Sequence, residues 1–184
     1  MISSCSPIDL LEQSIDYALV GIAGVEPSML HRQTPCSEWD LHDLLFHLAD
    51  SMLTLGELLG GAVGEVSGCG PAAKAAAAAR DLRRTIASID SEAMNSRGTI
   101  EGLPIPQHLV VLTGALEIAI HGWDIAQACR HPNPIPAQVA HGLLPRAPLL
   151  LDSTIRRDLF AAPIEPTPGA TVADRLVAYA GRRR

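Results

Sequence analysis

Residues 107–128 read QHLVVLTGALEIAIHGWDIAQA, and this stretch decides the fold class. It is long enough for a helix of about six turns and is apolar on nearly every side, as expected of a helix buried inside a protein. Three titratable residues, Glu117, His121 and Asp124, interrupt its apolar centre. A buried carboxylate is costly unless it is paired or bound to a cation, so these residues need partners in the core.

The three residues share one face of the predicted helix. Glu117 and His121 are four residues apart, so at ~100° per residue their directions differ by only about 40°. Asp124 follows Glu117 by seven residues and returns to nearly the same direction. The helix therefore carries a narrow polar stripe inside an apolar surface.

Helical spacing of apolar residues recurs elsewhere in the chain. The sequence predicts further helices over about 8–24, 38–59, 71–94 and 172–181, with Ser37 as the N-cap of the second. No segment alternates with a period of two for long enough to require a strand, and residues 95–106 indicate a connection.

These patterns predict an all-α protein. We expect a single domain over residues 1–184, with a four-helix bundle over about 8–130 and a short helical C-terminal annex over about 137–184.

Composition and charge argue against several classes of partner. The net charge is −6 and basic residues are scattered apart from 182–184, which we expect to be a solvated tail, so no nucleic-acid surface is expected. The run without charge inside 107–128 is far short of the ~20 residues that a membrane span needs. Four well-separated cysteines and an N-terminus without a signal peptide favour a cytoplasmic protein. Whether the chain forms a homodimer stays open.

A metal site is one explanation of the polar stripe. His47 lies in DLLFHLAD on the second predicted helix, surrounded by core leucines. His47, Glu117 and His121 could hold one divalent ion and leave open positions on it. Zinc suits these donors, and nickel, cobalt, manganese or iron would also fit. A hydrogen-bonded core histidine beside a glutamate explains the same spacing without a metal.

Four further residues lie close in sequence to this candidate site. Asp50 and Asp124 each follow a candidate histidine by three residues and are either outer hydrogen-bond acceptors or a solvated edge. Trp39 and Trp123 either line the pocket or pack in the core.

Three blocks of the sequence resemble a known family. TPCSEWDLHDLLFHLAD (34–50), EIAIHGWDIAQA (117–128) and DRLVAYAGR (174–182) resemble the actinobacterial proteins related to mycothiol-dependent maleylpyruvate isomerase, in the DinB-like superfamily. This resemblance implies a DinB-like four-helix bundle that binds a divalent metal, with the family's ligands falling on His47, Glu117 and His121.

The resemblance also implies a class of reaction. It suggests a metal-dependent transferase or isomerase that uses mycothiol, or a related small thiol, on an electrophilic small molecule, in detoxification or secondary metabolism. Two alternatives stay open: a metal-dependent hydrolase or lyase that uses no thiol, and a helical module that binds a small molecule or a partner without catalysis. Because the isomerase carries a further C-terminal domain, we expect a different specific reaction here.

Overall fold

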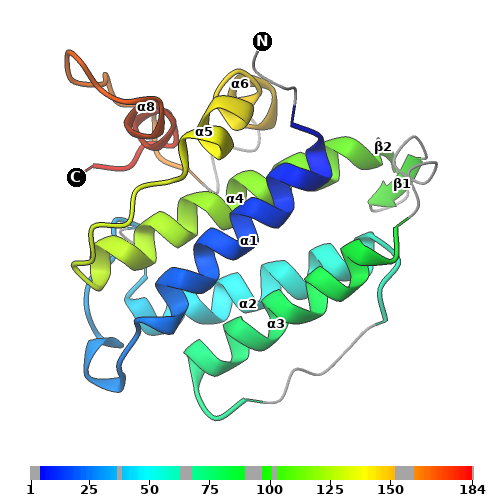
Figure 1. Ribbon diagram of the computed structural model, residues 1–184, viewed down its shortest axis with the longest axis horizontal. Coiled ribbons are helices and arrows are strands. Elements are labelled where there is room, and N and C mark those ends of the chain that lie inside the picture. The colour runs from blue at the N-terminus through cyan, green and yellow to red at the C-terminus, as the bar shows by residue number, and fades with distance from the viewer. Residues whose placement is uncertain are drawn as a thin grey trace.

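The computed structural model describes residues 5–36, 39–62, 68–89, 97–100, 103–151 and 160–183. Its elements are shown in Figure 1 and run in the order α1 (Pro7–Ala23), η1 (Pro27–Met29), α2 (Leu41–Leu58), α3 (Pro71–Ala87), β1 (Arg97–Ile100), β2 (Leu103–Pro106), α4 (Gln107–Ala128), α5 (Ala137–Leu143), α6 (Ala147–Leu150) and α8 (Val172–Tyr179).

The four long helices form a bundle. Helix α1 packs against α3 and α4, and α2 packs against the same two helices from the other side. Helix α5 lies against α1 and α4, α6 lies against α4, and α8 lies against α5, so the C-terminal helices cover one side of the bundle (Figure 1). The prediction of an all-α bundle with smaller helices after it is confirmed.

The ends of the helices follow local capping chemistry. Helix α1 starts with a capping box between Ser6 and Asp9. Helix α2 starts at Leu41 because the Asp40 side chain accepts a hydrogen bond from the Asp43 backbone N–H at 3.0 Å. The predicted start near residue 38 was therefore about three residues early, and the predicted cap Ser37 lies outside the described residues.

Two other predictions about local structure need correction. Helix α3 ends at Ala87, short of the predicted end near Met94, which lies outside the described residues. Strands β1 and β2 form an antiparallel pair, with Arg97 opposite Pro106, where a plain connection was predicted. Strands of four residues are too short to show a clear alternation in sequence. Prolines are tolerated in β2 because a two-stranded sheet leaves each strand one free edge.

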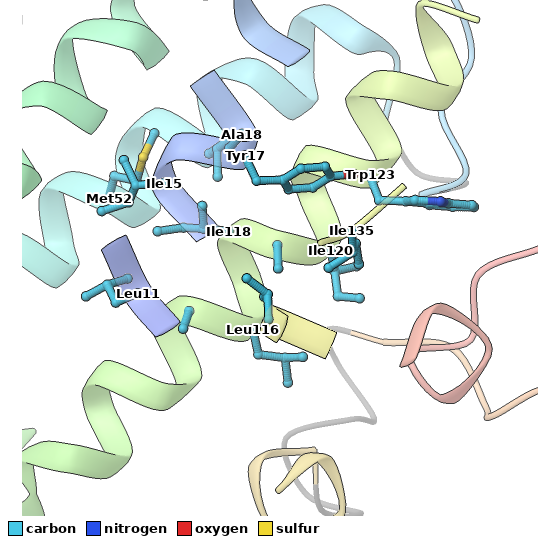
Figure 2. Packing of buried hydrophobic residues seen from close by; sticks show 14 of the residues in the cluster. Leu11, Ile15, Tyr17, Ala18, Met52, Leu116, Ile118, Ile120, Trp123 and Ile135 are labelled. Carbon is cyan, nitrogen blue, oxygen red and sulfur yellow. The ribbon is translucent and has the colours of Figure 1, made fainter. Parts of the chain in front are cut away.

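Helix α4 is buried on most sides, as its composition predicts. Its side chains pack with those of α1 and α2, among them Leu11, Ile15, Met52, Leu116 and Ile118 (Figure 2). Among the described helices, α4 alone is long and apolar enough to cross a membrane, but 72% of its most apolar window is buried inside the protein. A core helix passes this test as readily as a membrane span does.

Helices α1 and α4 approach closely at two glycines. A Cβ atom on Gly122 would lie 2.9 Å from Cε1 of Tyr17 and 3.2 Å from Cα of Ala18, which is too close without movement of α1. A Cβ atom on Gly21, on the facing helix, would lie 3.5 Å from its nearest neighbours, an ordinary contact. Close packing therefore requires glycine at position 122, whereas position 21 has room for an alanine.

We expect opposite effects from alanine at these two positions. Gly122→Ala should lower the free energy of unfolding by on the order of 1 kcal/mol, because overpacking of about 1–3 kcal/mol outweighs the gain in helix propensity. Gly21→Ala should be neutral or stabilising by up to about 1 kcal/mol. Urea unfolding of both variants measures the difference, and equal effects would contradict the packing described here.

Candidate metal centre

Three of the predicted residues meet in space. His47 comes from α2, and Glu117 and His121 come from α4; one ligand atom of each lies within 4.8 Å of the other two. Oε1 of Glu117 lies 2.7 Å from Nε2 of His47 and 3.1 Å from Nε2 of His121. One carboxylate oxygen thus faces a nitrogen from each imidazole, and both histidines present the same ring atom to the centre.

The two helices place these side chains in different surroundings. The side chain of His121 is only 4% exposed, whereas those of His47 and Glu117 are 29% and 21% exposed. His121 therefore forms the buried wall of the centre. His47 and Glu117 face the open side, where Oγ of Ser51 lies 3.4 Å from Nε2 of His47.

Asp124 determines the orientation and tautomer of His121. Its fully buried carboxylate lies 3.0 Å from Nδ1 of His121. A carboxylate ion only accepts hydrogen bonds, so Nδ1 carries the hydrogen and donates it. In neutral His121 this leaves the lone pair on Nε2, which points at Glu117. Asp124 is thus a buried hydrogen-bond acceptor and does not belong to a solvated edge.

Arg182 neutralises Asp124 from the C-terminal end of the chain. Its Nε lies 3.2 Å and 3.1 Å from the two carboxylate oxygens, and Arg182 itself is 5% exposed. The prediction that Arg182 lies in a solvated tail is therefore wrong. The motif DRLVAYAGR contains the residue, but no local pattern indicates that an arginine after the last helix is buried.

A Schellman motif directs Arg182 inward. Gly181 follows α8 with φ of +77°, a left-handed conformation that glycine adopts readily. The Gly181 N–H bonds the Ala178 carbonyl, and the Arg182 N–H bonds the Val177 carbonyl, which turns the chain back over the helix. A side chain on Gly181 would also meet the Ala161 carbonyl oxygen at 2.5 Å.

The two tryptophans have different roles. The Trp39 ring lies against the His47 ring, with centroids 4.2 Å apart. The loop before α2 holds it, because Thr34 Oγ1 donates to the Trp39 carbonyl at 2.8 Å. Trp123 is 2% exposed and belongs to the hydrophobic core, where it appears in Figure 2. Trp39 therefore packs on the centre and Trp123 supports the bundle.

Ion pairs and helix capping explain the positions of other acidic residues near the centre. The Asp50 side chain is 68% exposed, with one oxygen 3.9 Å from Nζ of Lys74, and it stands at the edge of the cavity described below. A second group of potential ligands, Asp40, His42 and Asp43, lies at the start of α2. There Asp40 caps the helix and pairs with His31 at 3.2 Å, which explains its position without an ion.

Charge interactions oppose the effect of burial in the centre. Burial alone would raise the pKa of Glu117, but the adjacent His121 and His47 hold it well below its usual range. Burial alone would lower the pKa of His121, but the charge of Glu117 and the hydrogen bond to Asp124 raise it to about 9. In the absence of an ion, His121 therefore holds a proton at neutral pH.

A cavity of about 600 Å³ opens beside His47 and Glu117, between α2 and α4. Helix α6 and Phe160 border it as well, so the C-terminal helices help to form its wall. This volume falls in the range of about 300–1,000 Å³ that is typical of ligand sites. No local pattern in the amino-acid sequence predicts this wall.

The donor set fits a divalent metal ion. Arg182 matches the charge of Asp124, but the described ion-pair partners of Glu117 are the two imidazoles, which carry no fixed charge. The centre therefore needs one more positive charge, from a proton or an ion. Two Nε2 atoms and one carboxylate oxygen match the ligand types of catalytic zinc sites, and the cavity leaves one side open.

Removal of Arg182 should leave Asp124 buried without its cation. We expect Arg182→Ala to lower the free energy of unfolding by about 3–5 kcal/mol. Arg183→Ala removes the same charge from an exposed neighbour and should change the free energy of unfolding by less than about 0.5 kcal/mol. Denaturant unfolding of the two variants makes the comparison, and equal effects would show that the ion pair contributes nothing.

A comparison with protein families identifies a relationship over most of the helical bundle. The model of the mycothiol maleylpyruvate isomerase N-terminal domain matches residues 11–126. The match covers more than half of the 184 residues and includes His47, Glu117, His121 and Asp124. No curated protein and no solved structure matches the chain. The chain belongs to the family of the mycothiol maleylpyruvate isomerase N-terminal domain.

Proposed function

We propose that this protein is a metal-dependent enzyme that activates a small thiol for reaction with an electrophilic small molecule, by transfer or isomerisation. The observation that carries the proposal is the convergence of His47, Glu117 and His121 at one end of an open cavity. Membership of a family described by a mycothiol maleylpyruvate isomerase makes mycothiol the favoured thiol.

The chain's own residues have distinct roles in this proposal. His47 and His121, through Nε2, and Glu117, through Oε1, would hold the ion. Two neutral imidazoles and one carboxylate leave a divalent ion with a net charge of about +1. Zinc is favoured for this set, and nickel, cobalt, manganese or iron would also suit it.

The surrounding residues keep the donors in place. Asp124 keeps the His121 lone pair on Nε2, and Trp39 packs against the His47 ring and restricts its rotation. A divalent ion bound here would lower the pKa of a thiol at its open side, so that a thiolate is available at neutral pH. The cavity gives the thiol and the electrophile access to that side.

Metal content tests the centre directly. We expect about one divalent ion per chain, lost in His47→Ala and Glu117→Gln and retained in His42→Ala, which alters the separate group at the start of α2. Chelation should lower the melting temperature by roughly 5–10 °C, because the ligands come from helices far apart in sequence. Elemental analysis and thermal unfolding provide the measurements. A wild-type protein that binds no offered ion would refute the proposal.

Thiol dependence tests the reaction. Metal-loaded protein should form a conjugate between mycothiol and an electrophile such as an aryl halide, and His121→Ala should reduce the rate to that without enzyme. Addition of the thiol should also change the visible spectrum of cobalt-substituted protein. Turnover that needs no thiol would favour a hydrolase or lyase, and saturable binding without turnover would favour a binding module.

A further inference from the structure

The cavity beside the candidate metal centre is a long trough between two helices. Its α2 side runs from His47 to Leu58, and its α4 side runs in the opposite direction, from Glu117 to Leu109. Leu58 follows His47 by eleven positions, which corresponds to roughly 16 Å at the helical rise of 1.5 Å per residue. The centre therefore lies at one end of the trough.

Polarity changes along this trough. The end at the centre carries His47, Ser51 and Glu117, with Asp50 at the edge. Away from it, apart from the hydroxyl groups of Thr54 and Thr113, the side chains are apolar and include Leu55, Leu58, Leu109, Leu149 and Phe160. A molecule lying along the trough would meet polar groups at one end and hydrocarbon at the other.

Exposed apolar side chains border the same trough. Within the described part of the chain, the large apolar residues with substantial exposure are Val20, Leu58 and Leu149. Two of these, Leu58 at 37% and Leu149 at 64% exposed, lie on this one cavity. Exposed apolar side chains that gather around a cavity favour a binding site over scattered surface positions.

The charges along the trough are negative. Asp50 and Glu117 line it, and no Lys or Arg of residues 5–36, 39–62, 68–89, 103–151 or 160–183 does. Two described cations in this region have carboxylate partners, Lys74 with Asp50 and Arg182 with Asp124. A ligand with a charged carboxylate at its distal end would therefore lose its hydration without gaining a partner from these residues.

We propose that the trough binds an uncharged, elongated substrate whose polar reactive head lies at His47 and Glu117 and whose hydrocarbon tail lies along Leu55, Leu58, Leu109 and Leu149. This inference rests on the proposed function only in taking the His47 end as the reactive end. It assigns the electrophile to a class of apolar molecules with one polar end, and the charges of the described residues disfavour dicarboxylates.

Binding of simple alcohols tests the proposal without turnover. The probes are the linear alcohols from 1-butanol to 1-decanol, with decanedioate as the charged match of the longest. Displacement of the neutral dye Nile red reports binding to the metal-free and the metal-loaded protein. Affinity should rise roughly three- to fourfold per methylene until the tail fills the trough. Decanedioate should bind metal-free protein at least tenfold more weakly than 1-decanol.

Two tryptophan variants show where the probes bind. Thr113 is exposed and lines the middle of the trough, so Thr113→Trp should weaken 1-decanol binding at least tenfold. Val20→Trp adds the same side chain to an exposed site on α1 and should leave binding unchanged. Affinity that does not depend on chain length, decanedioate binding as tight as that of 1-decanol, or equal affinity in the two variants would overturn the inference.

The outcomes separate this inference from the proposed function. A wild-type protein that binds no divalent ion but retains the chain-length dependence would refute the metal mechanism and support the apolar trough. A protein that binds the ion and forms thiol conjugates but shows no chain-length dependence would support the mechanism and overturn the trough.

Discussion

The buried charge of Asp124 is the constraint on which the rest of the site depends. A carboxylate with no solvent contact is stable only with charged or hydrogen-bonding partners, and Arg182 and His121 supply them. Arg182 reaches it because Gly181 turns the chain after α8. His121 in turn presents Nε2 to Glu117. A continuous chain of polar contacts therefore joins the segment after the last helix to the candidate metal centre.

The two core acids of α4 differ in a way that bears on function. Asp124 has a permanent cation beside it, so its charge is matched under all ordinary conditions. The partners described for Glu117 are two imidazoles, whose charge depends on protons. Glu117 is thus the group whose environment changes when a proton or an ion enters or leaves. A carboxylate buried for structural reasons alone would need a fixed cation, as Asp124 has. The pairing of Glu117 with two imidazoles favours a centre that binds a proton or an ion.

Close helix packing sets the geometry of the donors. At Gly114 the side chain of Leu55 lies across the backbone of α4, where a Cβ atom would collide with it. This contact holds α2 near α4 and helps to keep His47 within reach of Glu117. It also makes Leu55 part of the trough. The same packing that stabilises the bundle therefore positions the centre and shapes the apolar surface beside it.

The helical bundle and the residues of its polar centre could be predicted from the amino-acid pattern. Apolar spacing specifies α1, α2 and α4, and the cost of burying Glu117, His121 and Asp124 required polar partners in the core. The start of α2 was placed too early because Ser37 and Asp40 are both suitable caps, and the short strands β1 and β2 carry no periodic signal. The burial of Arg182 and the position of Leu149 and Phe160 beside the trough follow only from the folded arrangement of the chain. Those contacts join residues far apart in the chain, and no local pattern encodes them.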